Sequence, residues 1–381
     1  MVSAGNIISS VFCQACLAIV IIILSSGVPA QAAELKNGPA HQVKIGYLVT
    51  DNKSTAAVNG AELAIRKANK AGNSCGFRFS LIVKSMEGPW GTGSKQAVRL
   101  IFDDKVWALS GSHDGRNAHI VEQAATKTQV VFISSWSADP TLSQAFVPWF
   151  FNSVPNDLQQ AEALIQEICS TGNPGKIAII YNEDYDSRLA LSSLARQITA
   201  RGLPDVIEFR YEDYNRNAGQ LLDQLILNKP GCIILFCTPA VSHELFLKIK
   251  QSGMSQPLYG SVFILNEDLL TADQLRDFNH SLMIPSGSWS AAKSNSFINE
   301  YRQAFGKDPG MVAAYAYDGM NVLIEAIIKA GSSDREKIQK ALEEIKHKGI
   351  TGTFSFDEMG NRKEKIAITR VRDGLPLPPT R

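Results

Sequence analysis

The sequence predicts an α/β protein made of two doubly wound lobes, each built on a parallel sheet. The chain has 381 residues, enough for two domains that each bury a core. From residue 43 onward, short apolar runs alternate with helical stretches, and a second series of the same kind starts after Phe150. Strands separated by helices of this length favour right-handed crossovers and a sheet covered on both faces.

The first series starts with the apolar run Val43–Val49, which predicts a strand. Asn59 and Glu62 have the spacing of a capping box, so we expect the next helix to begin at Asn59 and to stop at Gly72. Further strands are expected over 77–86, 106–111 and 130–135, with helices over 93–105 and 117–129.

The second series repeats this architecture without repeating its residues, which implies a second lobe. We expect helices over 157–169, 187–202, 217–227 and 242–253, and strands over 176–182, 206–211, 232–238 and 258–263.

The final third departs from the alternation. Three helical stretches are expected between residues 293 and 346, followed by a hairpin over 350–371 that turns at residues 358–361. The proline-rich tail 374–381 is expected to be disordered or extended.

The N-terminal segment predicts export. The apolar run Leu17–Leu24 is followed by the small residues Ala30 and Ala32 in A-x-A spacing, which is typical of a secretory signal peptide over residues 1–33. No basic residue precedes Lys36, so an uncleaved anchor stays open as an alternative. Cys16 lies before the apolar run, which disfavours a lipoprotein. After this segment we expect no apolar stretch near the roughly 20 residues of a membrane span.

Composition and motifs disfavour several function classes. The net charge is +1 and basic residues are dispersed, which gives no footprint for nucleic acid. The sequence has no phosphate-binding Walker motif, no G-x-S-x-G elbow and no H-E-x-x-H motif, so an enzyme is disfavoured. We expect neither a metal site nor a cofactor.

Four cysteines remain after the N-terminal segment. Cys232 and Cys237 lie on one expected strand with opposite faces, so they should not pair with each other. An exported protein permits one bridge, but the spacing assigns none. The remaining two cysteines are Cys75 and Cys169.

An ordered set of motifs resembles one family. These are VKIGYLV at 43–49, GAELAIRKANKAG at 60–72, ISSWSADPTL at 133–142, KIAIIYNEDYDSR at 176–188, AAYAYDGMNVLIEAI at 313–327 and GITGTFSFDEMGNR at 349–362. Together they resemble the leucine/isoleucine/valine-binding branch of the type I periplasmic binding proteins, the solute receptors of ABC transporters.

The resemblance implies two lobes joined by three chain crossings. By analogy the crossings fall near 152–157, 284–288 and 346–352. Lobe 1 then comprises residues 43–153 and 287–347, and lobe 2 comprises 154–286 and 348–373.

Three turns at the ends of strands are candidates for a ligand site, because ligands of parallel α/β sheets bind beyond the carboxyl ends of the strands. They are residues 111–117 and 134–139 in lobe 1 and 182–186 in lobe 2. Backbone amides and helix starts at these turns favour an anionic group such as a carboxylate.

The resemblance places site residues on the first and third turns, with one departure. Gly115 stands where amino-acid-binding relatives usually present a serine to the carboxylate. Arg116 is suited to a carboxylate, although it equally fits a solvated first helical turn. Tyr185 matches a tyrosine that reaches across from lobe 2, with a surface tyrosine as its alternative. The neighbouring Asp184 and Asp186 are expected to be solvated.

The second turn departs from the relatives more strongly. They carry alanines and then a threonine where this chain has Trp136, Ser137 and Ala138, so backbone amides are kept and a hydroxyl is lost. Trp136 either forms a flat wall of the cleft or is an ordinary aromatic residue of the core. Trp90, in a loop rich in glycine and proline, is a second candidate wall.

Val262 stands where relatives often carry the acid that receives the ligand's ammonium. Either another acid such as Asp318 takes this role, or the ligand has no ammonium. Asp318 also fits a structural, helix-packing acid.

The resemblance therefore implies an extracytoplasmic solute-binding protein of an ABC importer. Its expected ligand is an amino acid or a related organic acid that carries a carboxylate, and its expected partner is a membrane permease. A sensory receptor that uses the same fold and signals through a membrane partner is the alternative.

Overall fold

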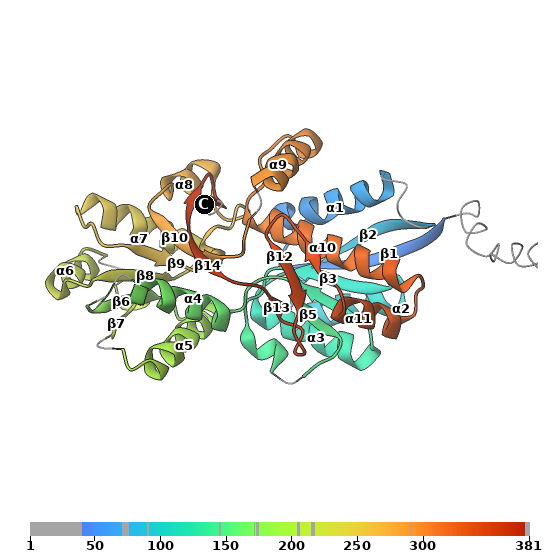
Figure 1. The fold of residues 1–381 in the computed structure, drawn as a ribbon, viewed down its shortest axis with the longest axis horizontal. Helices are drawn as coiled ribbons and strands as arrows, with labels where there is room; N and C mark the ends of the chain where they lie inside the picture. The colour runs from blue at the N-terminus through green and yellow to red at the C-terminus, as the bar shows by residue number, and fades with distance from the viewer. Residues whose placement is uncertain are drawn as a thin grey trace, which may run out of the picture.

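The computed structural model describes residues 40–70, 76–89, 91–144, 146–170, 172, 175–203, 206–214, 218–289 and 291–377. These ranges form two α/β lobes that lie side by side, each with a central sheet and helices packed on it (Figure 1). The predicted fold class is confirmed. The segment 1–33, which is expected to be a signal peptide, lies outside the described residues, as do Cys75 and Trp90.

Lobe 1 contains a parallel sheet in the order β2-β1-β3-β4-β5. Tyr47 and Leu48 are neighbours on β1, and both have no exposed surface. Tyr47 packs with α1 and α10 on one face of the sheet, and Leu48 packs with α2 and α3 on the other. Burial on both faces explains the continuous apolar run of this strand. The strands are β1 His41–Val49, β2 Phe77–Ser85, β3 Ala108–Ser112, β4 Phe132–Ser134 and β5 Phe150–Asn152, and the helices are α1 Thr55–Lys70, α2 Thr92–Phe102, α3 Gly115–Thr128, α9 Ala291–Phe305, α10 Met311–Ala330 and α11 Arg335–Glu343.

Lobe 2 contains a sheet in the order β15-β14-β10-β9-β8-β6-β7, in which β14 runs antiparallel to β10. Ile179 and Ile180 of β6 are fully buried on opposite faces. Ile179 packs with α4 and α5, and Ile180 packs with α6 and α7. The strands are β6 Ile177–Tyr181, β7 Val206–Arg210, β8 Cys232–Phe236, β9 Leu258–Gly260, β10 Leu282–Ser286, β14 Ala367–Arg372 and β15 Leu375–Pro376, and the helices are α4 Asp157–Ser170, α5 Tyr185–Ala200, α6 Ala218–Asn228, α7 Pro239–Gln251 and α8 Ala272–Asp277.

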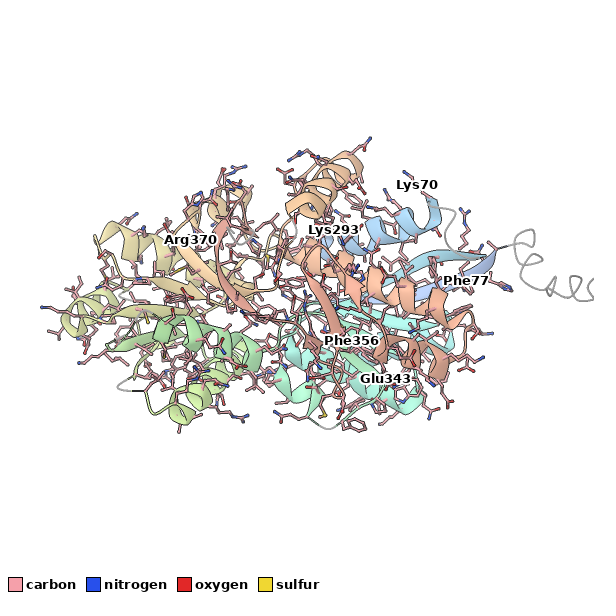
Figure 2. The ribbon with its side chains drawn as sticks, in the orientation of Figure 1. Lys70, Phe77, Lys293, Glu343, Phe356 and Arg370 are labelled. Carbon is pink, nitrogen blue, oxygen red and sulfur yellow. The ribbon has the colours of Figure 1, made fainter. Side chains whose placement is uncertain are left out.

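The last chain crossing differs from the expected one at 346–352. β11 His347–Lys348, β12 Thr353–Phe356 and β13 Arg362–Lys363 form a small antiparallel sheet beside β5. Figure 2 shows Phe356 of β12 within lobe 1 and Arg370 of β14 within lobe 2. The chain therefore crosses after β13. The expected assignment of 348–373 to lobe 2 fits β14 but not this hairpin, and the other lobe boundaries stay a proposal.

Arg362 explains why the hairpin stays with lobe 1. Its side chain is fully buried, and its guanidinium lies 4.0 Å from the centre of the Phe354 ring. It donates hydrogen bonds to the Ser153 carbonyl at 2.6 Å and to the Thr351 hydroxyl at 3.0 Å. A buried guanidinium needs such partners, so it fixes the hairpin against β5.

Helix α1 begins four residues before the predicted start at Asn59. The Asp268 carboxylate, which comes from lobe 2, accepts hydrogen bonds from the Ala56 amide at 2.9 Å and the Thr55 hydroxyl at 3.2 Å. This cap comes from a residue more than 200 positions away, so the local sequence pattern could not reveal it.

Several other expectations about local structure were wrong. The hairpin expected over 350–371 ends at β13, because β14 joins the other sheet. The tail 374–381, in contrast, has the extended form that was one of its two expected alternatives at Leu375–Pro376, which pair with β14 as β15. The short elements β5, α8 and β10 were not predicted.

Helix α10 also corrects the expectation about apolar stretches. It has the length and hydropathy of a membrane span, and within the described residues no other helix does. Of its most apolar 18-residue window, 83% is buried inside the protein, which is the burial expected for a core helix.

The three described cysteines, Cys169, Cys232 and Cys237, are free thiols. Cys232 and Cys237 are buried, and Cys237 donates to the Ile180 carbonyl at 3.4 Å. The described part of the chain therefore contains no disulfide.

Candidate functional site

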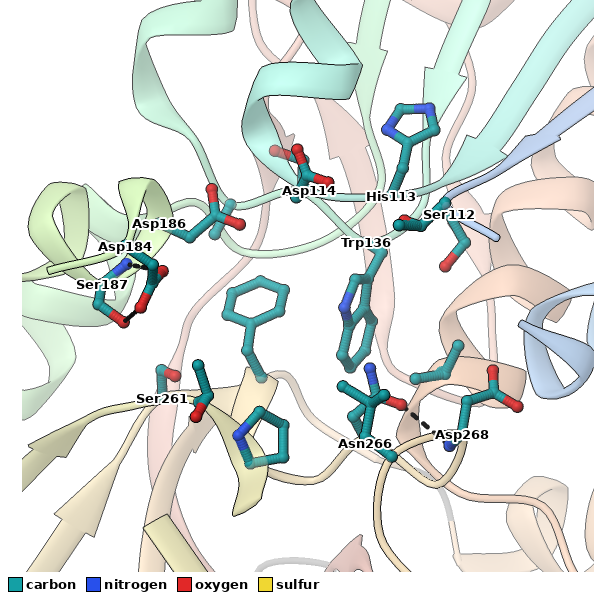
Figure 3. A pocket seen from close by; sticks show the side chains of 18 of the residues that line it. Ser112, His113, Asp114, Trp136, Asp184, Asp186, Ser187, Ser261, Asn266 and Asp268 are labelled. Carbon is teal, nitrogen blue, oxygen red and sulfur yellow. Dashed lines mark hydrogen bonds between the residues drawn. The ribbon is translucent and has the colours of Figure 1, made fainter. Parts of the chain in front are cut away.

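A cavity of about 260 Å³ lies between the two lobes (Figure 3). Its walls come from turns that follow β1, β3 and β4 in lobe 1 and β6, β8 and β9 in lobe 2. The carboxyl ends of both parallel sheets therefore face this space, as expected for ligand sites in such sheets. Asp157, the first residue of α4, contributes a further part of the wall next to a chain crossing.

Two helices begin at the cavity with aspartate caps. Asp114 accepts a hydrogen bond from the Asn117 amide at 2.9 Å and caps α3. Asp184 accepts from the Ser187 amide at 3.0 Å and caps α5. Aspartate is a preferred residue at this position, so both turns follow directly from the local sequence.

Trp136, Ser137 and Ala138 line the cavity. Trp136 is 8% exposed, and Figure 3 shows its indole extending from lobe 1 toward lobe 2. Its ring meets the Phe263 ring of lobe 2 edge-on, with 4.9 Å between centroids. This pair gives the cavity an aromatic wall to which both lobes contribute.

Gly115, Arg116 and Tyr185 lie beside the cavity rather than in its wall, and they join the lobes. The Gly115 amide donates to Asp186 at 3.1 Å, and the Tyr185 hydroxyl donates to Asp139 at 2.9 Å. The exposed Arg116 guanidinium lies 5.2 Å from the centre of the Tyr185 ring. The structure therefore does not bring Arg116 into the lining of the cavity.

Gly115 has a steric reason to be glycine. A Cβ atom at this position would lie 2.8 Å from the Asp186 carboxylate and 2.9 Å from the Tyr185 ring. A side chain as small as the serine of relatives would push the two lobes apart here. The glycine at position 115, in place of the serine of relatives, is therefore explained by the close contact between the lobes.

Val262 is fully buried, and its side chain is not part of the cavity wall. Its amide donates to Gln160 at 3.2 Å, while its neighbours Ser261 and Phe263 line the cavity. Trp90 lies outside the described residues.

Asp318 lies away from the inter-lobe cavity. Its carboxylate accepts hydrogen bonds from the Ile350 and Thr351 amides at 3.0 and 2.8 Å, and His347 lies 3.7 Å from it. Although burial opposes it, these contacts lower the pKa of Asp318. The residue fixes the loop before β12 to α10, which supports its structural interpretation.

The cavity wall is strongly acidic, which sequence reasoning missed. Lys53 is its one lysine or arginine among the described residues, and it is exposed. His113 is buried, and desolvation lowers its pKa to about 4, so it is neutral at neutral pH. Seven aspartates line the same wall: Asp51, Asp114, Asp139, Asp157, Asp184, Asp186 and Asp268.

Asp139 is the best compensated of these acids. His119 lies 2.9 Å from its carboxylate, and the Thr141 amide and the Tyr185 hydroxyl donate to it at 2.7 and 2.9 Å. Burial opposes ionisation, but these bonds lower the pKa of Asp139. Hydrogen bonds to Asp139 and Glu122 raise the pKa of His119 to about 9, so the histidine balances this acid with a positive charge.

Asp157 and Asp186 are not compensated in this way. Asp157 is 5% exposed, and no described residue donates a hydrogen bond to its carboxyl group. Burial, helped by the Asp186 and Asp139 carboxylates, raises its pKa well above the usual range. Asp186 accepts one hydrogen bond from the described residues, that of Gly115. Burial and the Asp114 carboxylate raise the pKa of Asp186 to about 7.

The position of Asp157 follows from the turn beside it. Its amide donates to the Ala138 carbonyl at 2.9 Å, which holds the first turn of α4 against the turn after β4. The sequence signal for this site was an aspartate that ends the first expected crossing, 152–157, and begins the next expected helix.

Two α/β lobes that enclose a cavity at the ends of both sheets define the class of two-lobed solute receptors. The chain belongs to the periplasmic binding protein family, whose model matches residues 42–375. This is a family of solute-binding proteins that are not enzymes, and membership implies an extracytoplasmic location.

Two curated relatives are of different kinds. Leu/Ile/Val-binding protein homolog 1 of Brucella suis is 22% identical over 89% of this chain and 93% of its own length. Glutamate receptor 3.4 of Arabidopsis thaliana is 22% identical over 75% of this chain. The chain spans about a third of that receptor's length, at 34%.

Solved structures share the fold. An ABC transporter substrate-binding protein from Desulfitobacterium hafniense in complex with Leu has a TM-score of 0.72 and 20% identity, over 88% of this chain and 98% of that one. A solute-binding protein from R. palustris in complex with benzoate has a TM-score of 0.73 and 16% identity, over 88% of this chain and 95% of that one. Related structures thus hold an amino acid in one case and an organic acid in the other.

Proposed function

We propose that this protein is the solute-binding component of an ABC importer and closes over a small amino acid or related organic acid. The observation that carries the proposal is the cavity between the lobes, which is lined by strand-end turns of both sheets. A ligand in this space contacts both lobes at once. Only a ligand with such differential contacts can shift a hinge equilibrium toward the closed form.

The described contacts suggest how an amino acid is held. The turn after β4 presents Ser137 and Ala138 to the cavity, and the Ala138 amide has no partner among the described residues. This amide is suited to the carboxylate of the ligand. Asp157 supplies a buried acid for the ammonium. It takes the place of the acid that relatives often carry where this chain has Val262. Among the alternatives left open by the sequence, this favours an amino acid over a simple organic acid.

We propose a periplasmic or similar extracytoplasmic location reached through the segment 1–33. The apolar run Leu17–Leu24 and the A-x-A site at Ala30 and Ala32 support cleavage after Ala32 or Ala33. The N-terminal sequence of the mature protein, read from cells, tests this. An N-terminus at Met1 or Val2 would show an uncleaved anchor instead.

A ligand screen with two readouts tests the function. Amino acids, aliphatic acids and aromatic acids are added to the purified mature chain, and the melting temperature and the radius of gyration in solution are measured. A ligand that raises the first and lowers the second supports binding with closure. If ligands bind tightly without compaction, hinge closure is wrong. If no class of small solute binds, the proposed function fails.

The importer partner needs its own test. The ligand-loaded protein should co-purify with an ABC permease and its ATPase subunits from the source membrane. The match to the plant glutamate receptor keeps a sensory role as the second candidate. Capture by a histidine kinase or a receptor ectodomain, in place of the permease, would favour that role.

A further inference from the structure

The charge of the cavity wall restricts the possible ligands more than the proposed function does. Seven aspartates face one exposed lysine and a neutral histidine, His113. A ligand without positive charge, such as a simple monocarboxylate, would enter a wall of like charge at close range. Like charges in a partly dry site repel strongly, so the wall disfavours such a ligand.

Most of these carboxylates already have partners within the protein. Asp114 and Asp184 cap helices, and Asp268 caps α1. Asp51 accepts hydrogen bonds from the residues that follow it, and Asp139 is balanced by His119. These five acids do not require a ligand.

Two acids remain, which is one more than a single ammonium group balances. Asp157 is buried, faces the cavity and receives no hydrogen bond from a described residue. Asp186 also lines the cavity and receives only the Gly115 amide among the described residues. A buried carboxylate is costly to ionise without a charged partner. One α-ammonium pairs with one of these acids, and the second stays protonated unless another cation pairs with it.

The two acids reach the cavity from different elements. Asp157 opens α4 and is held next to the Ala138 turn of lobe 1, while Asp186 lies in the first turn of α5 in lobe 2. Figure 3 shows Asp186 across the cavity from Asn266 and Asp268. Both acids line the same cavity, so a ligand in it with two positive groups can present one to each acid.

We propose that the ligand is a dibasic amino acid, with Asp157 and Asp186 holding its two ammonium groups. The inference rests on the proposed function, and it adds a side-chain cation to the amino acid expected there. Asp186 is the specificity-determining residue, because it is the acid that a neutral side chain leaves unpaired. The aromatic pair Trp136 and Phe263 covers the apolar stem of the side chain, as walls do for long basic side chains.

Lysine and norleucine make a matched pair for the test, since they share the α-amino acid group and the chain of carbons. Norleucine lacks only the terminal ammonium. By titration calorimetry the wild-type protein should bind lysine, or its shorter homologue ornithine, more than tenfold more tightly than norleucine. Equal or tighter binding of norleucine overturns the inference, and so does the absence of binding by both dibasic acids.

Two substitutions assign the roles. Asp186→Asn should lower lysine affinity more than tenfold while lowering norleucine affinity far less, whereas Asp157→Asn should weaken both amino acids. Asp223→Asn, an exposed acid on α6 outside the cavity wall, is the matched control and should change neither. If Asp186→Asn weakens lysine and norleucine equally, Asp186 has only a structural role and the inference is wrong.

The outcomes separate this inference from the proposed function. If norleucine binds with closure as tightly as lysine, the solute-binding function stands and the dibasic assignment fails. If the wider screen of small solutes finds no ligand at all, the function itself fails. Melting temperatures of both variants without ligand check that they fold, and Asp157→Asn should not lower this value because it removes an unbalanced buried acid.

Discussion

Tyr185 of lobe 2 donates a hydrogen bond to Asp139 of lobe 1, with 2.9 Å between the two oxygens. Asp139 is itself held by His119 and by Thr141, so the acceptor is fixed before the lobes meet. Because its two partners come from different lobes, opening of the lobes at this point would break the bond. The bond therefore favours the closed arrangement of the lobes, and its acceptor Asp139 is itself part of the cavity wall.

Removal of this bond should weaken ligand binding modestly. Tyr185→Phe keeps the ring under the Arg116 guanidinium and removes only the hydroxyl. A net loss of about 0.5–1.5 kcal/mol corresponds to a loss of affinity of roughly two- to tenfold. Calorimetry with the best ligand of the screen measures it. Unchanged affinity would show that the bond does not favour closure.

Restoring a side chain at Gly115 should keep the lobes apart. In Gly115→Ser the Cβ atom would lie within 3 Å of both Asp186 and Tyr185, so one of them must move. We expect a larger radius of gyration with saturating ligand and an affinity reduced more than tenfold, about 1.4 kcal/mol. Small-angle scattering with and without ligand checks this. A variant that closes like the wild type would show that the contact adapts.

The pH dependence of stability should carry the signature of Asp186. Its pKa is raised from 3.8 to about 7 in the folded state by burial and by the Asp114 carboxylate, with Asp184 and Asp139 adding to it. The folded protein therefore holds this proton more tightly than the unfolded chain. The stabilisation is present below about pH 4 and is lost as the pH rises toward 7.

Denaturant unfolding of the wild type and Asp186→Asn at several pH values isolates this effect. The stability of the wild type should fall relative to the variant between about pH 4 and pH 7, and the difference should then stay constant. Cationic ligands should bind more tightly as the pH rises from about 4 to 7, since they require the ionised carboxylate of Asp186. A difference that does not change with pH would contradict the raised pKa.

Glu267 should be important for stability rather than for binding. Its carboxylate accepts hydrogen bonds from the Gly310, Val312 and Ala313 amides at 3.0, 3.0 and 2.8 Å, which caps the start of α10. Glu267→Ala should cost about 0.5–2 kcal/mol of unfolding free energy, the usual cost of a lost cap. Glu267→Gln keeps an acceptor and should cost less. Chemical denaturation measures both, and equal losses would argue against the cap.

The sequence predicted the fold well because its signals are local. Each strand of the two series is a short apolar run, and each helix has its own period, as at Val43–Val49 and β1. The prediction failed where a local structure depends on a residue far away in the sequence. The start of α1 depends on Asp268, and the hairpin stays with lobe 1 because Arg362 is buried against Ser153.

The site was predicted only in part, for a related reason. Trp136, Ser137 and Ala138 line the cavity because a turn at the end of a parallel strand faces the ligand side in any such sheet. Whether an aspartate is balanced depends on which side chains reach it, and the sequence does not show this. Asp186 was therefore expected to be solvated, although the structure places it in the cavity wall with one amide as its described partner.

Glu267 and Asp268 are consecutive residues of lobe 2. Their carboxylates cap the N-termini of two helices of lobe 1, α10 and α1. A movement of lobe 2 that separated Glu267 and Asp268 from lobe 1 would break the caps of both helices at once. It would also leave both carboxylates without these hydrogen-bond donors. Opening of the lobes at this corner therefore costs the caps of two helices, whereas opening at the Gly115 side costs the hydrogen bonds that Asp186 and Asp139 accept from Gly115 and Tyr185.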